Sequence, residues 1–215
     1  TVSGPTVIAS DLNFNPAIEI LSGGFDGPAG AALGTNWTIF FVSRLLPTDD
    51  NGRLIEGSKI GYFLGYISNW SKVVFLNGSP NEYNYGIANQ SETDRQSTNI
   101  FTYSREESVG SLLTARFNGK TLKTYSTSNS AAGVIFDINQ GHNRVNESTH
   151  SRIGDFIIYN RALSATEILK VEAYLATKYG LQLNSANGGT DGDSTAQVLG
   201  SAIHAFAAKM VQEPG

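Results

Sequence analysis

Short apolar segments separated by turn signals make up the first two-thirds of the chain. Residues 37–44 (Trp-Thr-Ile-Phe-Phe-Val-Ser-Arg) are too apolar for a strand with one solvated face, which predicts a strand buried on both faces. The dipeptide Asn118-Gly119 lies between two further segments and favours a hairpin with a type I′ turn. The other strands are expected at 62–66, 72–76, 100–103, 112–117, 121–125, 134–138 and 153–159.

A single amphipathic helix follows these strands. Ser164 and Glu167 have the spacing of a capping box at its start, and Gly180 has the position of a C-terminal cap. Its apolar face consists of Ile168, Val171 and Leu175. Strands without intervening helices, closed by one helix, predict an all-β protein: an antiparallel two-sheet jelly-roll sandwich on which this C-terminal helix packs.

The composition of the chain changes after Leu183. Residues 184–195 are rich in Gly, Asn, Ser and Asp, which predicts a linker, and residues 196–211 show a second helical pattern. We therefore expect a domain over residues 1–183, a linker over 184–195 and a helical tail over 196–215. The tail would dock on its own domain or on a partner. No apolar run approaches the roughly 20 residues that cross a bilayer, so we expect no membrane insertion.

Charge and cysteine content narrow the classes of function. The 215 residues include 15 Lys and Arg against 19 Asp and Glu, a net charge of −4, which argues against a nucleic-acid-binding protein. Cysteine is absent, which excludes disulfides, thiolate catalysis and cysteine-ligated metals. Many glycines (23) and few charged residues (16%) suit a β-rich domain with many turns.

The segment 153–183 resembles the closing segment of laminin-G-like or concanavalin A-like jelly-roll domains. It runs from Ile-Gly-Asp-Phe-Ile-Ile-Tyr-Asn-Arg-Ala-Leu-Ser into a helix that ends Tyr-Leu-Ala-Thr-Lys-Tyr-Gly-Leu. Residues 13–18 and 23–27 resemble the opening strand and turn of the same family. The resemblance thus covers both ends and the strand order of residues 11–183.

This resemblance implies two antiparallel sheets packed face to face, with a ligand surface on the concave sheet or its rim loops. Such domains occur in bacterial surface adhesins, in secreted carbohydrate-active proteins and in phage tail, fibre or decoration proteins. We therefore expect an extracellular location, on a bacterial cell surface or a phage virion. Fold alone does not give the function, which depends on the residues of the site.

Carboxylates and histidines are the candidate catalytic residues. Jelly-roll glycosidases place paired carboxylates on one strand as Glu-x-Asp-x-x-Glu, and this motif is absent from the sequence. Glu106 and Glu107 are adjacent and would point to opposite faces of a strand. His142 and His150 have no evident nucleophile beside them in the sequence. The sequence therefore predicts a non-enzymatic protein, with a polysaccharide hydrolase or lyase that uses an unrecognised site as the alternative.

Two polar, aromatic segments are candidates for glycan binding. One contains Trp70, and the other contains Tyr83, Asn84 and Tyr85. Sugar rings stack on aromatic faces while amides bond to their hydroxyl groups, and Tyr83 and Tyr85 share a face if the segment is extended. The alternative is that these aromatic residues belong to the core or are half-buried in strands.

Asp49, Asp50 and Asn51 offer several hard oxygen ligands in one turn and are a candidate Ca²⁺ site. The same residues are also ordinary for a hairpin turn, which is the alternative. Ca²⁺ is accordingly the one cofactor that the sequence suggests.

Two functions follow from these observations. The first is a recognition module that binds glycan or another surface polymer through its rim loops. The second is a virion or filament structural protein that packs against neighbouring subunits through the 196–211 helix.

Overall fold

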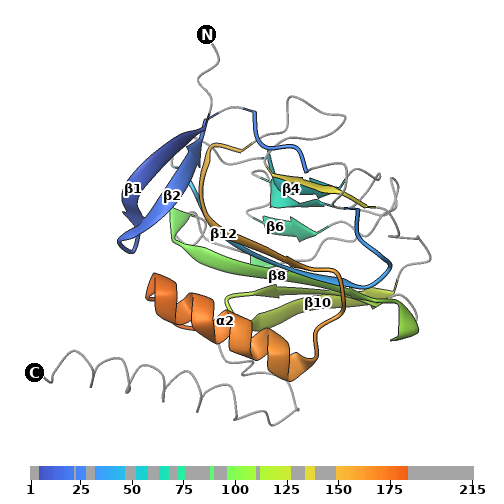
Figure 1. The fold of residues 1–215 in the computed structure, drawn as a ribbon. Coiled ribbons are helices and arrows are strands. Elements are labelled where there is room, and N and C mark those ends of the chain that lie inside the picture. Colours follow the sequence, from blue (N-terminus) through green and yellow to red (C-terminus); the bar gives the residue numbers. More distant parts are fainter. Residues whose placement is uncertain are drawn as a thin grey trace, which may run out of the picture.

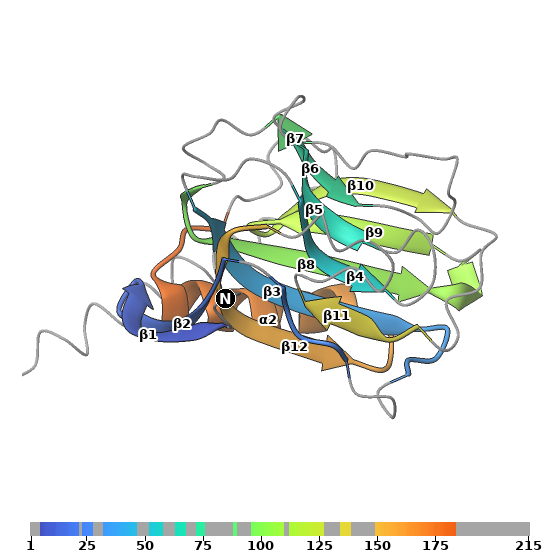
Figure 2. The same cartoon turned by 90° about the horizontal axis from the view of Figure 1, so that it is seen from above.

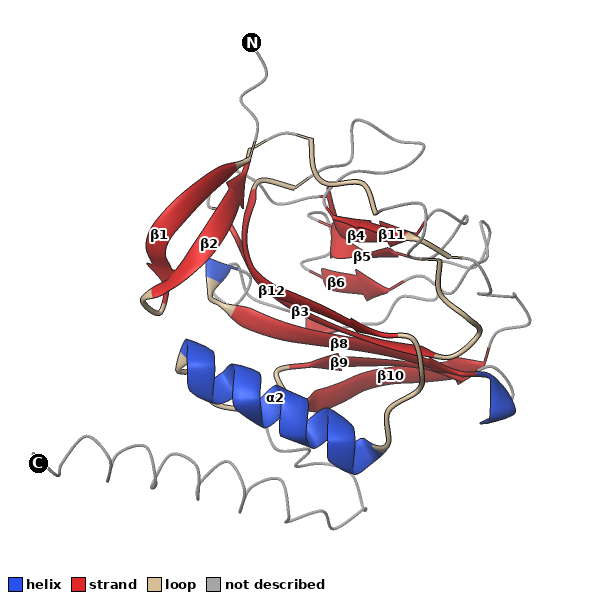
Figure 3. Cartoon of the chain, viewed as in Figure 1, coloured by secondary structure: helices blue, strands red, loops and turns tan. Residues whose placement is uncertain are grey.

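Two antiparallel sheets and a helix form the described part of the chain in the computed structural model (Figures 1 and 3). The structure describes residues 5–21, 23–27, 32–46, 52–57, 63–67, 72–75, 88–89, 96–109, 112–126, 134–138 and 149–183. The linker (184–195) and the helical tail (196–215) lie outside these residues.

The larger sheet has seven strands in the order β1-β2-β12-β3-β8-β9-β10, and the smaller has five in the order β11-β4-β5-β6-β7. The seven strands are β1 (Thr6–Leu12), β2 (Asn15–Ile20), β12 (Ser151–Tyr159), β3 (Trp37–Leu45), β8 (Asn99–Glu106), β9 (Leu112–Phe117) and β10 (Lys120–Ser126). The five strands are β11 (Phe136–Ile138), β4 (Gly52–Gly57), β5 (Phe63–Ile67), β6 (Lys72–Phe75) and β7 (Ala88–Asn89). All strand pairs are antiparallel, which confirms the predicted sandwich.

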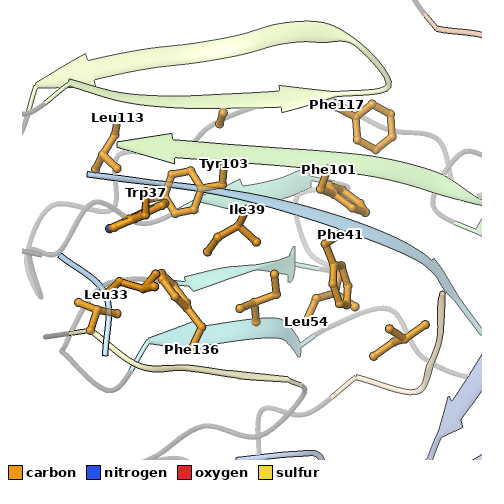
Figure 4. Close-up of a cluster of buried hydrophobic side chains, with 14 of the residues drawn as sticks. Leu33, Trp37, Ile39, Phe41, Leu54, Phe101, Tyr103, Leu113, Phe117 and Phe136 are labelled. Carbon is orange, nitrogen blue, oxygen red and sulfur yellow. The ribbon is translucent and has the colours of Figure 1, made fainter. Parts of the chain in front are cut away.

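Aromatic and aliphatic residues fill the space between the two sheets (Figure 4). Trp37 on β3 is fully buried, and its ring centroid lies 5.1 Å from that of Tyr103 on β8 and 5.2 Å from that of Phe136 on β11. Both contacts are edge-to-face, the geometry that aromatic quadrupoles favour. Trp37 therefore joins the two sheets, and its strand is buried along nearly its whole length, as its sequence predicts.

Two hairpin turns have left-handed backbone at both central positions. Asn118 and Gly119 have φ of 46° and 84°, which confirms the turn expected between β9 and β10. Asn13 and Phe14 have φ of 48° and 66° and join β1 to β2. The sequence did not reveal this second turn, because a phenylalanine rarely adopts positive φ.

The expected helix is α2 (Ala165–Tyr179). The Ser164 hydroxyl accepts from the Glu167 N–H, and the Glu167 carboxylate accepts from the Ser164 N–H at 2.9 Å, so the predicted capping box is present. Gly180 ends the helix with φ of 60°. No helix in the described ranges is long and apolar enough to cross a membrane.

Helix α2 packs on the face of the seven-stranded sheet that points away from the smaller sheet (Figures 1 and 2). Ile168 and Leu175 of the helix lie in a buried cluster with Phe40, Val42 and Ile100 of the sheet. This arrangement gives three layers: helix, seven-stranded sheet and five-stranded sheet. Strand β3 therefore contributes apolar side chains to both faces of the sheet, which explains its continuous apolar pattern.

A buried ion pair fixes the helix on this face. The Glu172 side chain is fully buried and accepts from Nε and Nη2 of Arg116 on β9, both at 2.9 Å. Its Oε1 also accepts from the Thr102 hydroxyl on β8 at 2.7 Å. A buried carboxylate is tolerated when its charge is paired and its oxygens are hydrogen-bonded, and both conditions hold here.

The C-terminal end of α2 is held by the β1–β2 hairpin and by β12. The Asn15 amide donates to the Lys178 carbonyl at 2.7 Å, and the Asn13 amide donates to the Tyr179 carbonyl. The Tyr179 ring covers Gly154 of β12, where an added Cβ would lie 2.8 Å from its Cζ. Side-chain amides thus satisfy carbonyls that a helix end leaves unpaired.

The buried ion pair predicts an asymmetric response to mutation. Arg116→Ala leaves an unpaired charge on the buried Glu172, so we expect it to lower the free energy of unfolding by about 3–5 kcal/mol. Glu172→Ala should cost less, because Arg116 is partly exposed and its charge can turn to solvent. Urea unfolding of both variants measures this order. Equal costs would contradict the account.

The capping box predicts a pH dependence. Hydrogen bonds from Arg161 and from Ser164 lower the pKa of Glu167 from 4.5 to about 2. A carboxylate with a lowered pKa stabilises the folded state above pH 4.5, and this contribution is lost as the pH falls towards 2. We expect the stability difference between the wild type and Glu167→Gln to shrink over that window in thermal melts. Arg161→Met, which removes the largest cause, should move the loss to higher pH.

Candidate functional site

The outer face of the seven-stranded sheet is largely occupied by structural contacts. Helix α2 covers part of this face (Figure 1). Ion pairs among β1, β2, β12 and β3 occupy a further part. Arg152 on β12 lies between Glu19 on β2 and Arg44 on β3 in the strand register. Asp11 on β1 accepts from Arg44 at 2.6 Å and from Arg152 at 2.5 Å, and Arg152 pairs with Glu19 at 2.7 Å. Two positive and two negative charges thus neutralise one another.

The shifted pKa values on this side have structural causes. Burial alone would lower the pKa of Arg152, but hydrogen bonds to Glu19 and Asp11 outweigh burial and raise it. The hydrogen bonds from Lys178 to Asp155, at 2.8 and 2.9 Å, raise the pKa of the ammonium group. Each shift belongs to an ion pair that joins neighbouring elements, which is the ordinary structural use of such pairs.

The outer face of the five-stranded sheet lies on the opposite side of the molecule from α2 (Figure 1). No described helix covers it. Strand β4 has an irregular register between Arg53 and Ile55, so Leu54 and Ile55 both belong to the core between the sheets. Such bulges re-aim the side chains that follow them. Because no described helix covers the outer face of the five-stranded sheet, this face is the candidate ligand surface.

At one margin of this sheet, Glu56 on β4 faces Asp137 on β11 in the register. Phe136 points into the core, so Asp137 points to the outer face. Both carboxylates are buried. Asp137 accepts from the Gly27 N–H at 2.7 Å, and Phe25 exchanges two backbone hydrogen bonds of 2.8 Å with Ile138. The segment 23–27 therefore covers this margin, and Asp137 positions that segment.

Neither Glu56 nor Asp137 was predicted as a site residue. Asp137 was recognised as part of a strand, but the strand that carries Glu56 was not predicted. Its apolar positions 54 and 55 are adjacent, so the bulge removes the alternation that marks a half-buried strand. The position of Asp137 opposite Glu56 depends on a pairing of segments about 80 residues apart, which no local pattern reveals.

The predicted ligand residues all lie outside the described residues. These are Trp70, Tyr83, Asn84 and Tyr85, and the same holds for the candidate Ca²⁺ ligands Asp49, Asp50 and Asn51. The structure therefore leaves these assignments as predictions. What it does describe is the sheet to which their segments connect.

The strand ends that flank two of these segments lie at the same end of the five-stranded sheet. Gly52, which follows the candidate Ca²⁺ residues, pairs with Tyr66. Ile67 and Lys72, which flank the Trp70 segment, pair with each other. Because neighbouring antiparallel strands alternate in direction, the segments before Gly52 and after Ile67 leave the sheet at one end. Ala88, which follows the tyrosine segment, begins the strand next to β6.

The described ranges contain no group of three or more His, Asp or Glu side chains that could hold a metal ion. Glu106 ends β8 and accepts from the Ser108 hydroxyl at 3.1 Å, whereas Glu107 lies in a short 3-10 helix (Glu107–Val109) and pairs with Arg105. The His150 carbonyl accepts from the Leu46 N–H at 2.9 Å. The carboxylates of Glu106 and Glu107 thus have separate structural contacts and do not form a catalytic pair.

No family profile and no curated protein sequence matches the chain. Its fold is similar to the CBM40 module of the Ruminococcus gnavus IT-sialidase bound to α2,6 sialyllactose. The TM-score is 0.54 at 18% sequence identity, and the match covers 73% of this chain and 96% of that chain. It is also similar to Trypanosoma rangeli sialidase in complex with sialic acid, with a TM-score of 0.59 at 13% identity, over 83% of this chain and 29% of that chain.

A third similar structure is the binding domain of Paraclostridial Mosquitocidal Protein 1. Its TM-score is 0.53 at 14% identity, over 81% of this chain and 47% of that chain. At such identities the comparisons establish the shared jelly-roll fold. The laminin-G-like assignment within that fold stays a prediction.

Proposed function

We propose that this protein is a non-catalytic, extracellular glycan-binding module. The observation that carries the proposal is the match to the whole of a carbohydrate-binding module: the chain covers 96% of the Ruminococcus gnavus CBM40 chain, but 29% of the Trypanosoma rangeli sialidase chain. The similarity therefore extends over a complete binding module and over a minor part of an enzyme. The lack of a glycosidase carboxylate motif in the sequence supports the same reading.

The five-stranded sheet and the loops that leave it are the proposed binding surface. The opposite face of the molecule carries α2 and a neutral network of ion pairs, so it offers a glycan few available groups. Trp70, Tyr83 and Tyr85 would supply stacking faces, and Asn84 would bond to sugar hydroxyl groups. Their segments connect to β5, β6 and β7 of the same sheet.

Sialylated glycans are the first ligands to test, since two of the similar CBM40 structures hold α2,3 and α2,6 sialyllactose. Binding of a single module is expected to be weak and to become useful when several modules engage one surface. The virion or filament role of the 196–211 helix stays a prediction, because these residues lie outside the described part of the chain.

A glycan titration tests the proposal. We expect the protein to bind sialyllactose more tightly than lactose in calorimetry, and a multivalent form to bind a sialylated array. Trp70→Ala or Tyr83→Ala should weaken binding about threefold to tenfold, the effect of one lost stacking contact. Tyr174→Ala is the matched control, because Tyr174 is an exposed aromatic residue on α2. An equal loss in this control, or no binding by the multivalent form, would refute the proposed surface.

We also propose that Asp49, Asp50 and Asn51 hold Ca²⁺ beside this surface. Carboxylate and amide oxygens are the ligands that Ca²⁺ prefers. Asn51 directly precedes Gly52, the first residue of β4 in the five-stranded sheet. Added Ca²⁺ should raise the melting temperature, and EDTA should reverse the effect. Asp49→Asn with Asp50→Asn should remove the response. A response that persists in this double variant would place the ion elsewhere.

A further inference from the structure

Three of the four edges of the two sheets carry features that prevent pairing with another chain. Strand β7 has two residues and β11 has three, and the free side of β11 already bonds to Phe25. Strand β10 contains Lys120 and Lys123, and its register is irregular between Thr121 and Lys123. Short strands, lysines, irregular registers and a covering segment are the usual ways in which proteins protect a sheet edge.

The fourth edge, β1, lacks most of this protection. It is seven residues long, contains no Lys, Arg or Pro, and pairs with β2 alone among the described strands. It begins with three β-branched residues, Thr6, Val7 and Ile8, and Val7 is 73% exposed. Figure 1 shows β1 at the outer border of the fold, with its free side turned away from the other labelled elements.

The regular part of β1 is its first half. Thr6, Val7 and Ile8 pair in sequence with consecutive residues of β2, and the register becomes irregular only after Ile8. The one charged residue of the strand, Asp11, lies beyond this point and is occupied by Arg44 and Arg152. The part of the edge that can accept another strand is therefore uncharged and centred on Val7.

We propose that β1 pairs antiparallel with β1 of a second copy of this chain, about a two-fold axis at Val7. In this register Val7 faces Val7 of the second copy, and Thr6 faces Ile8 of the second copy. No charge meets a like charge, and two β-branched residues face each other, which favours cross-strand pairing. The interface is self-complementary, as an isologous dimer requires.

A second copy fits this edge better than a head-to-tail neighbour does. Pairing of β1 with β10 of the next copy would place it along the edge that carries Lys120 and Lys123, and it would propagate without closing. The regular segment is short, so we expect a weak, reversible dimer with a dissociation constant in roughly the micromolar to millimolar range.

The proposed axis fixes how the two copies are arranged. The two-fold axis that relates paired antiparallel strands runs perpendicular to the sheet, so it joins the two seven-stranded sheets without exchanging their faces. Both five-stranded sheets would lie on one side of the joined sheet, and both α2 helices on the other. Two ligand surfaces would then meet one target together, and the dimer would gain avidity. The pairing itself does not depend on the glycan proposal.

Sedimentation velocity of the full chain, from about 1 μM to about 1 mM, tests the dimer. We expect a concentration-dependent monomer–dimer equilibrium. Val7→Lys places two lysines opposite each other and should raise the dissociation constant about tenfold or more, whereas Val7→Thr, which keeps a β-branched residue, should change it little. Because Val7 is mostly exposed, we expect both variants to fold, and unchanged melting temperatures would show this.

Crosslinking tests the register, because the natural chain contains no cysteine. Under mild oxidation, Val7→Cys should link to itself. Thr6→Cys and Ile8→Cys should each link poorly alone, but should form a mixed dimer when combined. The proposal is overturned by a monomer at every concentration, by open-ended assemblies, by a dimer that Val7→Lys leaves intact, or by Thr6→Cys linking to itself as readily as to Ile8→Cys.

Discussion

The position of α2 depends on one buried carboxylate, that of Glu172. A fully buried charge is stable only where compensating groups converge, and here these come from β8 and β9 through Thr102 and Arg116. The apolar cluster beneath the helix would tolerate small shifts along the sheet, because hydrophobic contact is not directional. The two-pronged hydrogen bond from Arg116 is directional, so it selects one placement.

This placement determines which surfaces of the sandwich remain open. With the helix held across the seven-stranded sheet, and with Asn13 and Asn15 of the β1–β2 turn bonded to its last carbonyls, the back of the molecule is closed by structural contacts. The proposed ligand surface lies on the five-stranded side. Glu167, whose pKa is lowered to about 2, lies on this closed side and serves the helix cap.

Much of this fold could be predicted from the sequence, because its determinants are local. The capping box at Ser164, the αL cap at Gly180 and the turn at Asn118-Gly119 each need a particular residue for a stated backbone reason. The strand at 52–57 was missed because the bulge at Leu54 removes the alternation of apolar and polar residues. The strand at 6–12 was missed because the turn that ends it contains Phe14, and phenylalanine rarely adopts a positive φ. The partner of Asp137 was missed because strand pairing across the chain leaves no local trace.

The burial of Trp37 has a spectroscopic consequence. The chain has two tryptophans, and the one at position 37 is enclosed by Tyr103 and Phe136, where its indole is shielded from water. Its emission is therefore a built-in reporter of whether the two sheets are still in contact. Replacing Trp70, which carries the other indole, leaves a single-tryptophan protein whose tryptophan emission responds to separation of the sheets.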